Sequence, residues 1–255
     1  MSIPFTAYCI VCPLVFLSGF VDSIAGGGGL ISLPAYLLAG LPAHQAIATN
    51  KLSSAIGTTA STARYLKNGC VSYRVAIPSV ILALIGSAIG TNLILMVPER
   101  YIQYLLLIIL PLVAVLVLRR RPAAAADTQQ MPRSRQVLLG TVCAFFIGMY
   151  DGFYGPGTGT FLLIMYTQLC HMPVEEASGT VKMVNLASNL MSMIVFLQKG
   201  QTLVVLGLVA SAFSLLGHLI GSGMVMKNGT RIVRPIIIVV LALLFIKVIS
   251  GLLGA

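Results

Sequence analysis

The sequence predicts an all-α polytopic membrane protein with two inverted-topology repeats and with broken or re-entrant helices at glycine-rich tips. Three observations carry this prediction: few charged residues, a glycine-rich segment that occurs twice, and an alignment of the two halves. Of the 255 residues, 58% are hydrophobic and 9% are charged, and the mean hydropathy is +0.98. Soluble domains carry about 25% charged residues, so this composition indicates several membrane segments and excludes a water-soluble protein.

Apolar segments alternate with short polar gaps along the chain. They cover residues 4–21, 30–41, 52–63, 75–96, 101–118, 136–150, 158–170, 183–198, 201–226 and 232–254. A bilayer core of about 30 Å needs about 20 helical residues, and the longest segments meet this need: 75–96, 101–118, 201–226 and 232–254. The segments 30–41, 52–63 and 158–170 are too short. We expect these to form hairpins or broken helices with their neighbours across the glycine-rich tips.

An arginine-rich polar linker (119–135) separates a first membrane repeat (1–118) from a second membrane repeat (136–255). The linker contains five arginines, which places it in the cytoplasm by the positive-inside rule. Each repeat has five segments, an odd number, so the second repeat is expected to be inverted. Both termini then face outward, and the expected location is the plasma membrane, which is the bacterial inner membrane.

The two halves align through residues that an apolar sequence rarely repeats by chance. At an offset of 129, the residues Gly19, Asp22, Gly26 and Gly28 match Gly148, Asp151, Gly155 and Gly157. At an offset of 131, the matches include Thr49 with Thr180, Lys51 with Lys182, Gly86 with Gly217 and Gly90 with Gly221. An aligned acid, an aligned lysine and two aligned Gly-x-x-x-Gly motifs indicate a duplication.

The glycine-rich tips begin with Asp22 in the first half and Asp151 in the second. Glycine costs about 1 kcal/mol within a helix, so these tips are expected to be unwound, with Gly27, Gly28, Gly157 and Thr158 close to a ligand. Two roles stay open for the aspartates. They cap the next helix or bond the N–H groups of the loop, or they couple transport to protons, as intramembrane carboxylates often do.

Two lysines are candidates for an anion site. We expect Lys51 and Lys182 each to begin a short helix, where free N–H groups and the helix dipole favour an anion. The alternative is that both lysines extend to the membrane interface. Neutral groups along the same helix faces are expected to help bind the substrate: Asn50, Ser54, Thr58, Asn185 and Asn189.

With these motifs, the chain resembles the sulfite exporter TauE/SafE family of membrane permeases. The resemblance rests on the Asp22 tip with residues 26–29, on Thr49-Asn50-Lys51, and on their looser copies in the second half, where Val181 replaces the asparagine. It covers about residues 8–253. It implies a secondary transporter, usually an exporter, of small sulfur-containing anions such as sulfite, sulfoacetate or other organosulfonates.

Other functions are weighed against this one. An anion channel, or an importer of another small organic anion, is the main alternative, and a more remote one is an intramembrane hydrolase that uses His218. Because no serine-hydrolase elbow is present, we expect no enzyme activity. We also expect no metal or cofactor and no nucleic-acid partner. The partners are the small anion and the lipid bilayer, with a homodimer left open.

Overall fold

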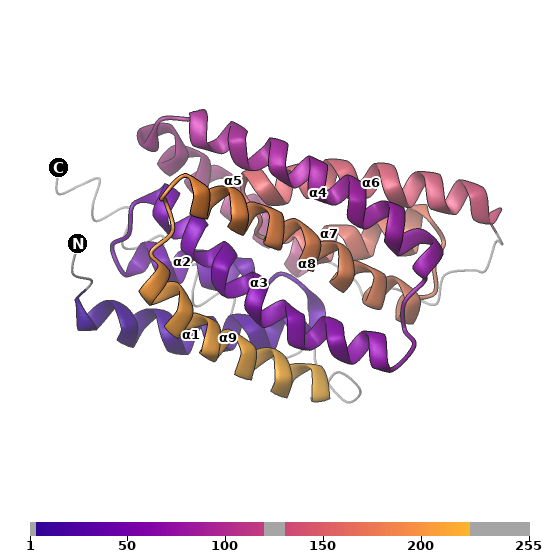
Figure 1. Ribbon diagram of the computed structural model, residues 1–255, viewed down its shortest axis with the longest axis horizontal. Helices are drawn as coiled ribbons and strands as arrows, with labels where there is room; N and C mark the ends of the chain where they lie inside the picture. Colours follow the sequence, from indigo (N-terminus) through magenta and orange to yellow (C-terminus); the bar gives the residue numbers. More distant parts are fainter. Residues whose placement is uncertain (1–3, 120–130, 225–255) are drawn as a thin grey trace.

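The computed structural model describes residues 4–119 and 131–224, and within these ranges the chain is helical without any β-strand. The long helices pack side by side as a bundle (Figure 1). The predicted all-α architecture is therefore confirmed. The elements are α1 (Phe5–Ala25), α2 (Gly29–Leu38), α3 (Ala43–Lys67), α4 (Tyr73–Met96), α5 (Glu99–Arg119), α6 (Arg133–Phe153), α7 (Thr158–Ile164), the π-helical η1 (Met165–Leu169), α8 (Val174–Gln198) and α9 (Val204–Met224).

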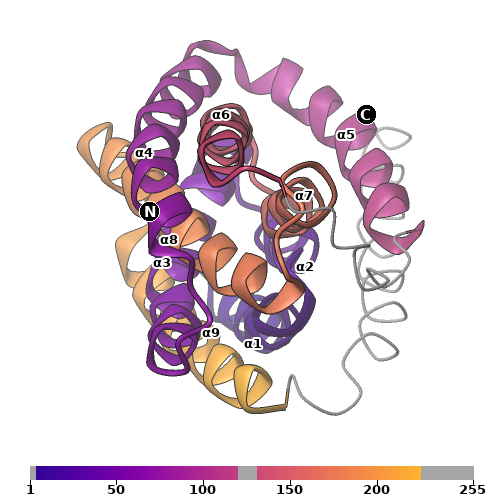
Figure 2. The same ribbon diagram turned by 90° about the vertical axis from the view of Figure 1, so that its right-hand side faces the viewer.

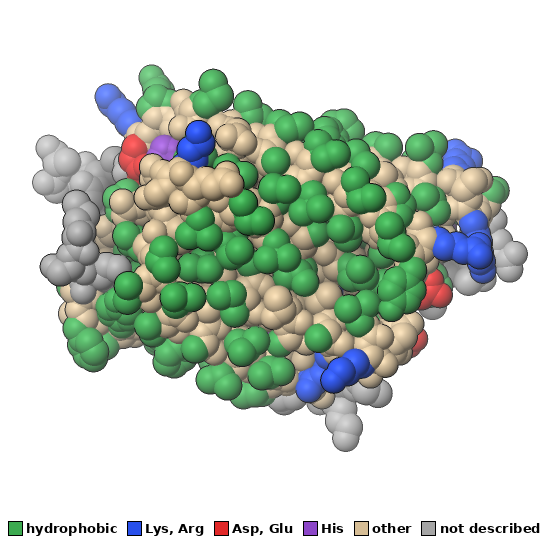
Figure 3. Space-filling model, in the orientation of Figure 1, with side chains coloured by type: hydrophobic (Ala, Val, Ile, Leu, Met, Phe, Trp, Pro, Cys, Tyr) green, Lys and Arg blue, Asp and Glu red, His purple; other side chains and the backbone are tan. Residues whose placement is uncertain are grey.

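Among the described residues, five helices are long and apolar enough to cross a bilayer: α1, α4, α6, α8 and α9. Their outer faces are apolar. On α4, exposed hydrophobic side chains recur at every fourth position: Ile77, Ile81, Ile85, Ile89 and Leu93. Hydrophobic side chains are spread over the middle of the face in Figure 3, and the charged side chains lie near its edges. Such a surface suits lipid, so the polytopic membrane prediction is confirmed, while the predicted segment 232–254 lies outside the described residues.

The glycine-rich tips are turns between helices that fold back on each other. In the first half, α1 and α2 form such a hairpin, and in the second half α6 does so with α7 and η1. The tips touch: Gly26 has a φ of +70°, and a Cβ on it would lie 2.9 Å from Thr160 N. The two hairpins point toward opposite ends of the bundle (Figure 1). Viewed along the bundle, α2 and α7 lie in its interior and α5 at its edge (Figure 2).

Two helices begin earlier than the sequence predicts. The apolar pattern predicts helix starts at Lys51 and Lys182, but α3 begins at Ala43 and α8 at Val174. Both lysines therefore lie inside long helices, and these two predicted helix starts are wrong. The physical reason is that the polar residues which interrupt the apolar pattern are buried between helices. Their partners come from the other half of the chain, which a local pattern does not reveal.

Equivalent helices of the two halves make exchanged contacts. Helix α4 packs along α6, and α9 packs along α1. A Cβ on Gly90 would overlap the backbone oxygen of Met149, and a Cβ on Gly221 would likewise collide with that of Phe20. Gly90 and Gly221 are equivalent at the offset of 131, and Phe20 and Met149, whose backbone oxygens they approach, are equivalent at the offset of 129. The aligned Gly-x-x-x-Gly motifs therefore allow the same close backbone crossing twice.

The two ends of the bundle differ in their basic residues. One end carries the α3–α4 turn, whose Ser72 N–H donates to Thr180 Oγ1 at 3.1 Å, together with the start of α6. The opposite end carries the α4–α5 and α8–α9 turns (Figure 1). Among the residues that the structure describes, the first end carries Arg64, Lys67, Arg74, Arg133 and Arg135, and the second carries Arg100 and Lys199. Which end faces the cytoplasm stays a prediction.

Candidate functional site

A polar cleft lies where the two glycine-rich tips meet α3, α8 and α9. Its cavity volume is about 30 Å³, which is room for about two water molecules at roughly 10–15 Å³ each. Both aspartates and ten of the eleven predicted substrate-binding residues line it: Asp22, Gly27, Gly28, Asn50, Lys51, Ser54, Thr58, Asp151, Gly157, Thr158, Asn185 and Asn189. The remaining one, Lys182, contacts Asp22 beside the cleft.

Lys51 and Asp151 form an ion pair between the two halves. The ammonium nitrogen lies 2.8 Å from Asp151 Oδ2, and both side chains are 2% exposed. The ammonium group also donates to Asn189 Oδ1 at 3.1 Å. Asp151 accepts two further hydrogen bonds, from Thr158 Oγ1 at 2.8 Å and from Ser188 Oγ at 2.6 Å. The carboxylate thus holds the tip of α7 to α3 and α8.

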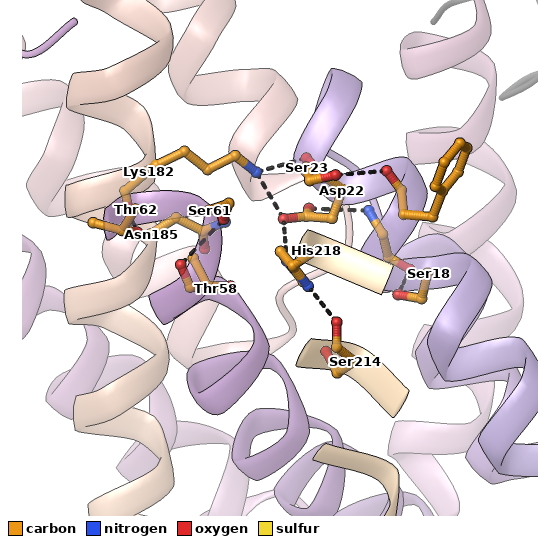
Figure 4. A network of polar contacts seen from close by, with 12 residues as sticks. Ser18, Asp22, Ser23, Thr58, Ser61, Thr62, Lys182, Asn185, Ser214 and His218 are labelled. Carbon is orange, nitrogen blue, oxygen red and sulfur yellow. Dashed lines mark hydrogen bonds and ion pairs between the residues drawn. The ribbon is translucent and has the colours of Figure 1, made fainter. Parts of the chain in front are cut away.

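Lys182 and Asp22 form the reciprocal pair. The ammonium nitrogen lies 2.8 Å from Asp22 Oδ2 and 2.6 Å from the backbone oxygen of the same residue. Asp22 Oδ1 accepts from the N–H of Gly28 at 3.2 Å, so this carboxylate bonds the loop N–H as one of its two predicted roles requires. Figure 4 shows His218 on the other side of Asp22, with Nε2 3.3 Å from the same Oδ2.

The two pairs are crossed, which a reading of each repeat alone does not reveal. Asp22 is 29 positions before Lys51 in the sequence, but its partner is Lys182 in the other half. The same exchange joins Asp151 to Lys51. A buried lysine without a partner is costly in a membrane, and each half supplies the carboxylate that the other needs.

Neutral polar groups line the cleft beside the Lys51 pair. Asn189 Nδ2 donates to the side-chain oxygen of Asn185 at 2.8 Å, which ties these two amides together. Asn50 differs, because its buried Oδ1 has no hydrogen-bond partner in the described protein. Ser54 and Thr58 follow on the same helix, α3, and also line the cleft. A buried amide oxygen without a partner can accept a hydrogen bond from a water or a ligand, and the NH₂ group of the same amide can donate one.

The electrostatics of the cleft differ from the expectation in two respects. The helix N-termini at the cleft belong to α2 and α7, since α3 and α8 begin elsewhere. In addition, neither lysine presents an uncompensated charge, because each has a carboxylate at 2.8 Å. Two lysines and two aspartates sum to zero formal charge. An anion in this cleft therefore meets hydrogen-bond donors and ammonium groups that are shared with carboxylates.

Some cleft residues were missed by the sequence reading. Ser18 and Ser32 come from α1 and α2, and both donate hydrogen bonds to the oxygen of Gly28, at 2.8 and 3.4 Å. His218, which the sequence suggested only for the hydrolase alternative, is 2% exposed and hydrogen-bonded, and it also lines the cleft. Its place between two serines of an apolar helix carries no signal, except that it lies within an aligned Gly-x-x-x-Gly motif.

Comparisons with known proteins point to one family. The sequence model described as sulfite exporter TauE/SafE matches residues 11–248. The chain is 34% identical to a probable membrane transporter protein of Haemophilus influenzae over 94% of this chain and 93% of that protein. It is 33% identical to the probable membrane transporter protein ORF9 of Sinorhizobium sp. over 92% and 89% of the two chains. It is 30% identical to the probable membrane transporter protein YfcA of Escherichia coli K12 over 92% of this chain and 86% of that protein.

No solved structure matches the chain with significance. The family match spans nearly the whole length, and it agrees with a bundle whose described part has five candidate membrane spans around a polar cleft. The chain is therefore a membrane transporter that belongs to the sulfite exporter TauE/SafE family.

Proposed function

We propose that this transporter exports small sulfur-containing oxyanions, with sulfite, sulfoacetate and other organosulfonates as its substrate class. The observation that carries the proposal is the cleft, where buried lysines, amides and hydroxyl groups converge at the meeting point of the two tips. A sulfonate group has three oxygens that accept hydrogen bonds, and the cleft wall is rich in donors. The family description gives the sulfur chemistry, and the cleft residues give the anion chemistry.

The anion binds next to Lys51 and shares its ammonium group with Asp151. Lys51 Nζ already has two acceptors, and a third donor position is left for a substrate oxygen. Asn50 turns its unpartnered amide so that the NH₂ group faces the anion. Ser54 and Thr58 add hydroxyl donors one and two turns further along α3. Because the lysine charge is shared, binding is weak enough for release, which a transporter requires.

Alternating access follows from the two hairpins. The tips of α1–α2 and α6–α7 contact each other beside the cleft, and each hairpin points to the opposite end of the bundle. In the proposed cycle, one half rocks against the other around the crossed ion pairs, as in transporters with inverted repeats. The end with Arg64, Lys67 and Arg133 faces the cytoplasm by the positive-inside rule. The inside-negative membrane potential then favours outward movement of any substrate that crosses with a net negative charge.

Counterflow in proteoliposomes tests the substrate class. Vesicles loaded with unlabelled sulfoacetate should accumulate labelled sulfoacetate, and external sulfite should compete better than acetate. Saturation of this exchange supports a carrier, whereas non-saturating flux with a steady conductance supports the channel alternative. Absence of exchange with every sulfur oxyanion tried, in vesicles that contain folded protein, would refute the proposed substrates.

A pair of variants tests the binding site. Asn50→Leu removes the unpartnered amide, and we expect it to raise the half-saturation concentration for sulfoacetate by about tenfold or more, equivalent to about 1.4 kcal/mol. Asn68→Leu is the matched control, because Asn68 is exposed after the end of the same helix. Equal affinity in the two variants would remove Asn50 from the site.

A further inference from the structure

His218 lies between two hydrogen-bond acceptors in the interior of the protein. Its Nδ1 is 2.9 Å from the backbone oxygen of Ser214, one turn earlier on α9, and its Nε2 is 3.3 Å from Asp22 Oδ2. The side chain is 3% exposed. A backbone carbonyl only accepts hydrogen bonds, so Nδ1 carries a proton. A neutral imidazole would then turn the lone pair of Nε2 toward the carboxylate oxygen.

The other partners of Asp22 show where the next proton lies. Oδ1 accepts from the N–H of Gly28, and Oδ2 already accepts from the ammonium group of Lys182. A proton on Oδ2 would face that ammonium group, whereas a proton on His218 Nε2 gives every donor an acceptor. We propose that His218 and Asp22 hold one proton between them, carried mainly on Nε2, and that this proton is bound and transported together with the anion. This inference rests on the proposed function.

The equivalent place in the other half holds no such proton. Ser87 is the counterpart of His218 at the offset of 131, and its hydroxyl group bonds to Ser188 O at 2.6 Å. Among the described residues, Asp151 bonds to an ammonium group and two hydroxyl groups, and no imidazole is among these partners. The two ion pairs are therefore alike in geometry and different in chemistry, so the coupling proton belongs to the Asp22 side alone.

The charged groups around His218 fit this assignment. From α1 it faces Asp22, and through that carboxylate it faces Lys182 of α8. From α3, Arg64 Nη1 donates to the backbone oxygen of Leu219 at 3.0 Å and to Ser222 Oγ at 2.9 Å, and both acceptors lie on α9. With the proton present, Lys182, His218 and Asp22 sum to +1, and without it they sum to zero. The cleft attracts an anion better in the protonated state, so proton and anion favour each other's binding.

Nitrogen-15 NMR tests the proton without any substrate. The chain contains three histidines, so the spectrum of histidine-labelled protein in detergent is simple, and His218→Gln identifies the His218 signals. At neutral pH, both ring nitrogens of His218 should be protonated in the wild type. In Asp22→Asn, Nε2 should lose its proton, because the amide can donate to the ring nitrogen. An unprotonated Nε2 in the wild type at neutral pH would overturn the proposal.

Calorimetry of sulfoacetate binding tests the coupling. In the wild type, affinity should fall as the pH rises through the titration of the pair, by about 5- to 150-fold, which is the usual range for coupled sites. Titrations in buffers of different ionisation enthalpy should show almost no proton uptake at neutral pH, where the free pair already holds its proton, and up to about one proton per anion at a higher pH, where the free pair has lost it. His218→Gln should bind without proton uptake and with a flat pH profile. His171→Gln is the control, since His171 lies in the turn before α8 and does not line the cleft.

The two proposals fail in different ways. If His218→Gln keeps the full pH dependence, the coupling proton is refuted while the anion site stands. If the wild type binds no sulfur oxyanion, the proposed substrate class is refuted, and the NMR spectrum still decides whether His218 and Asp22 hold a proton.

Discussion

Replacement of Lys51 by methionine measures what the crossed ion pairs contribute to stability. Lys51 and Asp151 are each 2% exposed, and their charged atoms are 2.8 Å apart. Methionine keeps the length and bulk of the side chain, so the main change is the loss of the positive charge. Asp151 keeps its two hydroxyl donors but loses its cation. Removal of one partner from a buried pair costs about 3–5 kcal/mol.

Thermal unfolding in detergent is the assay. A chain of this size loses about 2–4 °C of Tm per kcal/mol, so Lys51→Met should lower the Tm by about 6–20 °C. Lys67→Met is the control, because Lys67 is exposed near the end of the same helix, and its Tm should change by about 2 °C at most. The loss of Tm in Lys51→Met should become smaller as the pH is lowered, because a protonated carboxyl group at Asp151 costs less to bury than a carboxylate.

The double variant Lys51→Met/Asp151→Asn completes the test. With both charges gone, the burial cost disappears, and stability should return to within about 1–2 kcal/mol of the wild type. Transport should stay lost, since the proposed anion site lacks the Lys51 ammonium group. A single Lys51 variant as stable as the wild type would refute the reasoning, and so would a double variant no more stable than the single one.

Three further predictions concern other parts of the fold. Lys182→Met should lower the Tm by less than Lys51→Met does, because its partner carboxylate is more exposed (13%) and keeps an imidazole beside it; equal Tm losses would contradict the different chemistry of the two pairs. Gly90→Ala should destabilise by about 1–3 kcal/mol, because the added methyl group would overlap backbone of α6; an unchanged Tm would mean that the crossing relaxes freely. On a cysteine-free background, a single cysteine in the turn 68–72 should react with an impermeant reagent from the cytoplasmic side and one in the turn 199–203 from the outside; the reverse pattern, or labelling of both turns from one side, would refute the proposed orientation.

Much of the architecture could be read from residue patterns. The composition predicted a polytopic helical protein, and the repeated aspartate–glycine segments predicted two tips at which regular helices end. Both follow from local physics, because lipid demands apolar helices and glycine disfavours a helix interior. The full length of α3 was beyond such reasoning. Residues Thr49-Asn50-Lys51 interrupt the apolar pattern, and only partners from distant segments make their burial within a helix favourable.

The sequence predicted most of the residues that line the cleft, but it did not predict how their charges are paired. Nearly all predicted residues line one cleft, because equivalent positions in the two halves converge there. The sequence also showed two acids and two lysines, without showing which acid belongs to which lysine. His218 had no local signal at all, since a histidine in an apolar helix is usually a bonded core residue.

The sequence by itself determined which groups the site would contain: two aspartates at helix breaks, two lysines among small polar residues, and glycines where backbones approach. These depend on residue type and spacing alone. The tertiary structure decided the pairing, because Asp22 meets Lys182 and Asp151 meets Lys51 across more than 90 positions of chain. It also placed His218 against one carboxylate and Ser87 against none. The energy of a buried charge depends on what lies within a few ångströms in space, and distance along the chain does not report that.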